Sequence, residues 1–214
     1  MDTRPRDGSA THLRVRGLEC RRGERALFRG LDFAVRPGEI VWLRGANGQG
    51  KTTLLRTLAG LSAPEAGEIA WSGADRHARF VYLAHANALK EELTIAESLR
   101  FLLAVAGEPP ASAAVDAALA RFDLASRRHA AVRTLSQGQR RRVALARLAL
   151  LAAPSTWLLD EPFDALDASG IDALNALIVE HAQRGGSTVL TSHVPLRIAK
   201  PVPIVVQLES SGAA

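Results

Sequence analysis

The sequence predicts an α/β fold in which strands lie on both sides of an inserted helical block. The first third alternates short β-type runs with turn residues, and residues 93–152 are rich in Ala and Leu at helical spacing. Strand-type runs return from residue 155. Because this order is typical of an α/β core with a second lobe, we expect one domain over 1–214. We place its α/β core at about 12–86 and 154–209, and its helical lobe at about 90–152.

The first third is predicted to form strands around one helix. Arg36, Pro37 and Gly38 form a clear turn, and the strand after it runs into a glycine-rich loop. A helix over 51–61 follows, because the leucines at 54, 55, 58 and 61 fall on one face. The predicted strands are LRVRGL (13–18), LDFAV (31–35), EIVWLRG (39–45), GEIAWSG (67–73) and FVYLA (80–84).

The helical block has one loose segment, GEPPAS at 107–112, in which we expect Ser112 to cap the next helix. A basic helix is predicted over 140–151. Another helix, at about 169–184, is predicted to stop at Gly185-Gly186, and the tail ESSGAA is expected to be disordered. The predicted strands of the last third are STWLLD (155–160), STVLTSH (187–193) and PIVVQLE (203–209).

Composition indicates a globular protein of a reducing compartment. The single Cys20 cannot form an internal disulfide, and the N-terminal segment lacks the apolar stretch of a signal peptide, so the default location is the cytosol. The best apolar window, 143–153, is interrupted by Arg147 and is too short to span a bilayer.

The formal charge is +5, but the arginines are scattered, RRR at 140–142 is the longest run, and only 5% of residues are aromatic. This pattern argues against binding to nucleic acid.

A phosphate-binding loop is the main chemical signal. Residues 45–52, GANGQGKT, fit the pattern G-x-x-x-x-G-K-S/T between a predicted strand and a predicted helix. Glycines are needed there because backbone N–H groups must curl around a phosphate where a Cβ would obstruct them. Lys51 can then reach phosphate oxygens, and the Thr52 hydroxyl can ligate Mg²⁺. The predicted phosphate-binding residues are Gly45, Ala46, Asn47, Gly48, Gln49, Gly50, Lys51, Thr52 and Thr53.

Two further elements agree with a nucleotide site. The apolar run TWLL ends in Asp160 and Glu161, and a carboxylate is unfavourable there unless an ion or a polarised water lies beside it. We expect Asp160 to hold the Mg²⁺ shell and Glu161 to polarise the attacking water. Ser136, in LSQGQ, can cap the basic helix, whose first N–H groups could bind an anion.

These motifs together resemble the ATPase subunit of an ATP-binding cassette (ABC) transporter. GANGQGKTT, LSQGQRRRVALAR, WLLDEP, ALD (165–167) and TSH (191–193) occur in the family's order, and the resemblance covers residues 13–197. It implies a P-loop NTPase core of the ABC ATPase type, with an N-terminal antiparallel β part and an inserted α-helical lobe.

The resemblance also implies a head-to-tail dimer in which ATP and Mg²⁺ on one protomer are closed over by Ser136 and Gly138 of the other. Asp167 is then expected in the loop that connects the two sites. His193 is expected to contact the γ-phosphate, although a lone histidine at a strand end can also be purely structural. Hydrolysis of ATP to ADP and phosphate would use Glu161, His193 and Lys51.

Three departures from the family pattern carry information. The slot for the aromatic residue that stacks on adenine falls at Arg22, which can stack through cation–π contact or can simply be a solvated arginine. In the family's usual signature motif two glycines are adjacent, and here Gln137 replaces the first of them. The second, Gly138, is retained, and we expect it to be the one that needs close backbone approach. The usual glutamine after the YL strand is missing, and its slot falls at His85 or Ala86.

These departures resemble the haem-exporter ATPases of cytochrome c maturation. The shared features are Cys20-Arg21-Arg22, Ala84-His85 with Lys90, and the endings RRVALARL, WLLDEPF and LTSH. This branch implies a peripheral subunit on the cytoplasmic face of the inner membrane, bound to integral membrane permease subunits. The sequence has no Cys-x-x-Cys-His and no histidine pair at ligand spacing, so no direct contact with haem is expected.

Some alternatives stay open. The stretch VYLAHANALKEELT (81–94) has neither helical nor strand periodicity, which favours a switch loop with His85 facing phosphate and residues 87–90 facing the membrane partner. An idle surface loop is the other interpretation. The chain could also serve another small ABC importer or exporter. A soluble cassette protein acting on nucleic acid usually carries two cassettes or a long coiled coil, which 214 residues do not hold.

Overall fold

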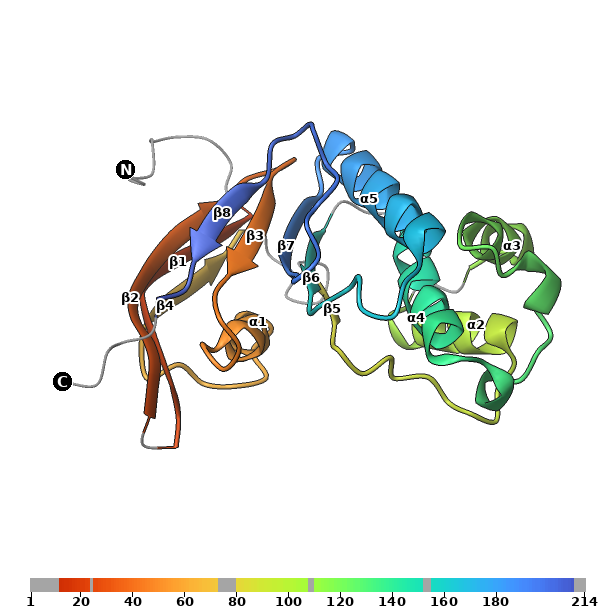
Figure 1. Ribbon diagram of the computed structural model, residues 1–214, viewed down its shortest axis with the longest axis horizontal. Coiled ribbons are helices and arrows are strands. Elements are labelled where there is room, and N and C mark those ends of the chain that lie inside the picture. Colours follow the sequence, from red (N-terminus) through yellow and green to blue (C-terminus); the bar gives the residue numbers. More distant parts are fainter. Residues whose placement is uncertain (1–11, 24, 73–79, 108–109, 152–154, 210–214) are drawn as a thin grey trace. The chain divides into compact units, whose positions relative to one another are not determined.

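The computed structural model of the protein describes residues 12–23, 25–72, 80–107, 110–151 and 155–209 (Figure 1). Part of the predicted loop at 107–112 and nearly all of the predicted disordered tail at 209–214 lie outside these residues. The chain divides into two compact units. Unit 1 comprises Met1–Tyr82, Pro154–Asp160 and Val179–Ala214, and unit 2 comprises Leu83–Ala153 and Glu161–Ile178.

Unit 1 begins with a three-stranded antiparallel sheet. It consists of β1 (Leu13–Arg22), β2 (Arg25–Val35) and β4 (Ala66–Trp71) in the order β2-β1-β4. Leu13 pairs with Val35 on one side and with Trp71 on the other. Strands therefore form at the runs predicted over 13–18 and 31–35, both longer than predicted, and over the described part of the run predicted at 67–73.

The second sheet has five strands in the order β5-β6-β7-β3-β8. Its members are β3 (Ile40–Arg44), β5 (Phe80–Leu83), β6 (Thr156–Leu159), β7 (Ser187–Thr191) and β8 (Ile204–Gln207). β7 is parallel to both β3 and β6, and β3 is parallel to β8. Parallel pairing brings the carboxyl ends of β3, β6 and β7 to one edge of the sheet, where such folds place their ligands.

Helix α1 (Lys51–Leu58) packs into the core of unit 1. Leu54 and Leu55 are fully buried together with residues of both sheets, as the predicted apolar face requires. The helix ends three residues before the predicted Leu61, which is 57% exposed. Gly60, at φ 70°, permits a Schellman ending in which the N–H of Leu61 donates to the Arg56 carbonyl and that of Gly60 to the Thr57 carbonyl.

Unit 2 is mainly helical. It contains α2 (Ile95–Val105), α3 (Ser112–Arg121) and α4 (Gln137–Ala146), with 3₁₀ turns η1 (Ala125–Arg127), η2 (Val132–Thr134) and η3 (Arg147–Leu150). The three α-helices contact one another and bury apolar residues such as Leu99, Leu119 and Val143. The basic helix predicted over 140–151 is thus α4 continued by a 3₁₀ turn. Helix α5 (Ala168–Gln183) begins in unit 2 and ends in unit 1.

The prediction that Ser112 caps a helix is wrong. The N-cap of α3 is Ala111, and Ser112 is its first helical residue. The Ser112 hydroxyl instead accepts from the guanidinium groups of Arg100 at 3.2 Å and Arg128 at 2.8 Å. Competition from these two arginines removes the oxygen that would otherwise cap the helix.

Within the part of the chain that is described, no helix is long and apolar enough to cross a bilayer.

Candidate functional site

The glycine-rich loop of unit 1 joins the buried strand β3 to the start of α1 (Figure 1). Gly50 is the N-cap of α1 in a left-handed conformation, with φ 94°. A Cβ at this position would lie 3.0 Å from the Leu27 Cβ, so the position favours glycine on both conformation and space. No side chain caps α1. Its first N–H groups can therefore donate hydrogen bonds to an anion held by the loop.

Lys51 lies over this loop with only 9% of its surface exposed. Its Nζ donates to the Gly45 carbonyl at 2.8 Å and to the Ala46 carbonyl at 3.3 Å. The side chain therefore curls back over residues 45–50 instead of extending into solvent. A cation held at this place is suited to neutralise the oxygens of the phosphate that the sequence predicts at this loop.

Thr52, on the next position of α1, faces the strand end that carries Asp160. Asp160 is 2% exposed and follows β6, so its carboxylate lies at the carboxyl edge of the parallel sheet. Its Oδ1 accepts from Thr52 Oγ1 at 3.2 Å and from Thr191 Oγ1, at the end of β7, at 3.0 Å. The structure thus brings together the two residues predicted to hold Mg²⁺.

The donor set fits a magnesium ion. A carboxylate and a hydroxyl are hard oxygen ligands, and Mg²⁺ is usually held by one or two such groups together with water and substrate phosphates. Among the described residues, no group of three or more His, Cys, Asp or Glu side chains forms a metal site. Thr52 and Asp160 are therefore the kind of oxygen pair that water and substrate phosphates would complete around Mg²⁺, with Lys51 beside them as a cation for the phosphates.

A pocket of about 260 Å³ opens beside the loop and connects Lys51 with His193. His193 is exposed, two residues after β7. The turn that carries it is fixed because Ser192 Oγ bonds the backbone of Val194, and Trp42 Nε1 donates to the Ser192 carbonyl at 3.2 Å. The pocket is lined by Trp42, Arg44, Gly45, Lys51, Ser192, His193, Pro195 and Gln207.

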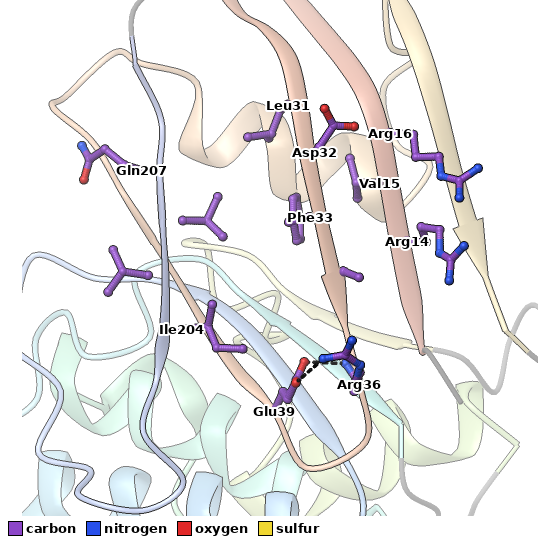
Figure 2. A pocket seen from close by; sticks show the side chains of 13 residues that line it. Arg14, Val15, Arg16, Leu31, Asp32, Phe33, Arg36, Glu39, Ile204 and Gln207 are labelled. Carbon is purple, nitrogen blue, oxygen red and sulfur yellow. Dashed lines mark hydrogen bonds and ion pairs between the residues drawn. The ribbon is translucent and has the colours of Figure 1, made fainter. Parts of the chain in front are cut away.

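A larger groove in unit 1, of about 730 Å³, lies along β1, β2 and β8. Figure 2 shows Leu31 and Phe33 of β2 and Ile204 of β8 along it, with Arg36 paired to Glu39. None of the predicted site residues lines this groove. The larger of these two pockets thus does not coincide with the predicted site.

Arg22 lies at the exposed end of β1. It lines neither of the two pockets, and its proposed stacking on adenine stays a prediction. Cys20, two residues earlier, is buried, with its Sγ 3.6 Å from Thr57 Oγ1, and burial raises the pKa of its thiol. In the run Cys20-Arg21-Arg22, the first residue thus belongs to the core and the last to the surface.

In unit 2, Ser136 caps α4 as predicted. Its hydroxyl accepts from the Gln139 N–H, and the Gln139 side chain accepts from the Ser136 N–H, which forms a capping box. A Cβ on Gly138 would lie 2.6 Å from the Ala165 carbonyl. Gly138 therefore makes a close backbone approach within its own chain, to the segment that precedes Asp167.

Glu161 and His85 also belong to unit 2. Glu161 has φ 46°, a left-handed conformation that is uncommon for a residue with a Cβ, and its carbonyl accepts from Arg141 at 2.7 Å. His85 is exposed, with Nδ1 3.5 Å from Asp164 Oδ2. The carbonyls of Ala84 and His85 both accept from Arg141 as well.

Asp167 lies at the start of α5. Its Oδ1 accepts from the Gly170 N–H at 2.9 Å and from the Arg142 guanidinium. The Gly170 backbone bond first, and then Arg142, lower the pKa of the Asp167 carboxyl. Arg142 also bonds the Phe122 carbonyl and Asp123 Oδ2, so it ties the start of α5 to the helical part of the unit.

Sequence reasoning missed the roles of Arg141 and Arg142, which it counted as scattered charge. They are 2% and 8% exposed, respectively. Thr191 was quoted only as part of a motif, although its hydroxyl bonds Asp160. One sequence signal could have revealed the arginines: they are followed directly by the apolar run VALA at 143–146. All four residues of this run are buried in the structure.

Comparison with known proteins places these motifs in context. A protein-family model described as ABC transporter matches residues 28–164. A cytochrome c biogenesis ATP-binding export protein CcmA from Dechloromonas aromatica is 49% identical over 87% of this chain and 94% of its own length. A protein of the same name from Aromatoleum aromaticum is 46% identical over 96% of this chain and 99% of its own. A solved ATP-binding subunit of an ABC transporter matches with a TM-score of 0.74 and 28% identity, over 86% of this chain and 80% of that one.

Proposed function

The chain belongs to the ABC transporter family, and from this premise we propose that it is the ATP-hydrolysing subunit of a membrane complex of cytochrome c biogenesis. Its work in that complex is to drive the export of haem or the release of haem from a periplasmic carrier. The observation that supports the ATPase assignment is the convergence of Lys51, Thr52 and Asp160 on one loop and strand edge. Two relatives named for cytochrome c biogenesis, 49% and 46% identical to most of the chain, support the biological role.

The chemistry proposed for unit 1 is binding and charge neutralisation. The N–H groups of residues 45–53 hold the phosphates, the Lys51 ammonium neutralises their oxygens, and His193 contacts the γ-phosphate from the same pocket. Thr52 and Asp160 hold Mg²⁺, which when bound supplies positive charge to the phosphate oxygens.

Unit 2 supplies the groups proposed for turnover and coupling. Glu161 is the base that polarises the attacking water in the reaction ATP + H₂O to ADP + phosphate. Ser136 and Gly138 close over the nucleotide of a second copy, and Asp167 connects the two sites. Arg22 of unit 1 stacks on adenine. His85 takes the place of the glutamine that the family usually has after the YL strand and that is missing here.

We further propose that the protein acts as a homodimer bound to integral permease subunits on the cytoplasmic face of the inner membrane. The proposed domain is single, with an α/β core at about 12–86 and 154–209 and a helical lobe at about 90–152. Haem passes through the membrane subunits without contacting this chain.

The test is purification of the complex from its native membrane, followed by ATPase and ATP-binding assays. Glu161→Gln should retain ATP affinity and lower turnover by about a hundredfold or more, because only the water-activating carboxylate is lost. Lys51→Ala should weaken ATP binding by about tenfold, the effect of losing a charged hydrogen bond. Wild-type turnover in the first variant, or unchanged affinity in the second, would refute the assignment.

The cargo is tested in cells that carry Glu161→Gln. The haem-bound form of the periplasmic carrier should accumulate there, while wild-type cells release its haem. If the carrier is unaffected and the neighbouring genes encode neither a multi-span permease nor haem-handling proteins, the chain serves another small ABC importer or exporter.

A further inference from the structure

Arg141 is a buried cation on α4 that bonds two loops far apart in the sequence. Its Nε donates to the Pro162 carbonyl at 3.2 Å, and one Nη donates to the Glu161 carbonyl at 2.7 Å. The other Nη lies within hydrogen-bonding distance of the 84–87 loop, 3.1 Å from the Ala84 carbonyl and 3.1 Å from Asn87 Oδ1. Arg141 is 2% exposed; its bond to Pro162 is buried, and its bonds to Ala84, Asn87 and Glu161 are partly buried.

The 84–87 loop and the segment at Glu161 both depend on contacts from the rest of the unit to keep their conformation. Residues 84–87 form no helix or strand, and Glu161 has a left-handed φ of 46°. A residue with a Cβ persists in that conformation only where its surroundings enforce it. Arg141 bonds the carbonyl of Glu161 itself, which fixes the peptide that follows the glutamate, and from the same guanidinium it also fixes the 84–87 loop.

Only arginine can make this set of contacts. Its guanidinium presents five N–H donors in one rigid plane, whereas lysine offers a compact ammonium and glutamine only two donors. The helix that carries Arg141 is itself anchored by the Ser136–Gln139 capping box. A rigid donor on a rigid helix can keep the two loops in a fixed relation.

We propose that Arg141 is a positioning residue that couples the 84–87 loop to Glu161, so that displacement of this loop by phosphate or by the membrane partner moves the glutamate backbone. The proposal rests on the proposed function, because it takes Glu161 as the water-activating carboxylate. The bonds described for Arg141 go to the 84–87 loop and to the Glu161 and Pro162 carbonyls, which the proposed function links to hydrolysis, so we expect Arg141 to act on turnover.

The experiment measures kcat and KM for ATP in the assembled membrane complex carrying Arg141→Ala or Arg141→Lys. Displacement of a catalytic group by a small distance can cost about a hundredfold in rate, so we expect kcat to fall by about tenfold or more with KM within about twofold. Methylguanidinium added to the Arg141→Ala complex should restore part of the lost kcat. The control is Arg128→Ala, which removes a guanidinium bonded to Asp116 and Ser112 in the same unit and contacts neither loop.

The outcomes separate the possibilities. Wild-type kcat in both Arg141 variants overturns the proposal, and so does a loss of kcat that methylguanidinium does not restore and that Arg128→Ala reproduces. If Arg141→Ala does not fold, Arg141→Lys decides alone: reduced kcat at unchanged KM and melting temperature supports coupling, and any other result overturns it. A wild-type complex without ATPase activity, or an active Glu161→Gln complex, refutes the proposed function and this inference with it.

Discussion

The buried histidine of unit 1 makes stability depend on pH in a way that can be calculated. His181 is 3% exposed, and its ring stacks on Trp157 with centroids 3.7 Å apart and planes 5° apart. Its Nε2–H donates to the Ser155 carbonyl at 2.8 Å. Burial is the main cause that lowers the pKa of His181 from 6.5 to about 4, and the charges of Arg184 and His12 act in the same direction.

The sign of the effect follows from which state binds the proton. The unfolded chain protonates this histidine near pH 6.5, whereas the folded protein resists protonation until about pH 4. Its stabilising effect is therefore complete above pH 6.5 and is lost as the pH falls toward 4. One pKa unit corresponds to about 1.4 kcal/mol, so the free energy of unfolding should drop by about 3 kcal/mol between pH 7 and pH 4, with about 2 kcal/mol of this lost by pH 5.

The assay is urea unfolding followed by circular dichroism at pH 7 and pH 5. His181→Gln removes the titrating ring and keeps an N–H donor, so its loss of stability between the two pH values should be about 2 kcal/mol smaller than that of the wild type. His129→Gln, which removes an exposed histidine of unit 2, is the control and should behave as the wild type. Equal pH dependence in His181→Gln and the wild type would refute the reasoning.

Three further predictions concern the proposed site. Asp160→Asn should raise the Mg²⁺ concentration that gives half-maximal ATPase activity by about tenfold or more, because a hard anionic ligand is lost; an unchanged Mg²⁺ titration would contradict the assignment. Gly138→Ala should destabilise the protein by about 1–3 kcal/mol in thermal or urea unfolding, because its Cβ would meet the Ala165 carbonyl at 2.6 Å, while Ala at the exposed neighbour Gln137 should have little effect. His85→Ala should lower ATPase activity in the assembled complex, and unchanged activity would favour the idle surface loop.

The α/β framework was predictable because its signals are local. Each predicted strand has a counterpart among the described residues, with ends shifted by up to six residues, because each combined β-type composition with flanking turn residues. The strand, glycine loop and helix at 39–61 were predictable for the same reason, although the Schellman ending shortens α1. Ser112 was mispredicted because capping by a short polar side chain depends on what else competes for its hydroxyl, and here the competitors are Arg100 and Arg128.

The geometry of the candidate site was only partly predictable. The motif order named Lys51, Thr52 and Asp160, and parallel pairing of β6 and β7 explains why Asp160 and Thr191 meet at one strand edge. The close approach between Gly138 and Ala165 depends on how the helical unit packs. No local pattern around residue 138 specifies that distance.

The run RRR at 140–142 shows why a count of charges does not predict their role. Arg141 and Arg142 are 2% and 8% exposed, and the donors described for them bond carbonyls, an amide oxygen, a serine hydroxyl and two carboxylates of their own chain. Phosphate backbones are bound by cations that face solvent, so these two guanidiniums cannot serve as such a surface. Their positions imply a different use of charge: Arg141 holds the 84–87 loop and Glu161, and Arg142 holds Asp167. One helix that begins at the signature serine thus fixes three of the loops on which the proposed reaction depends.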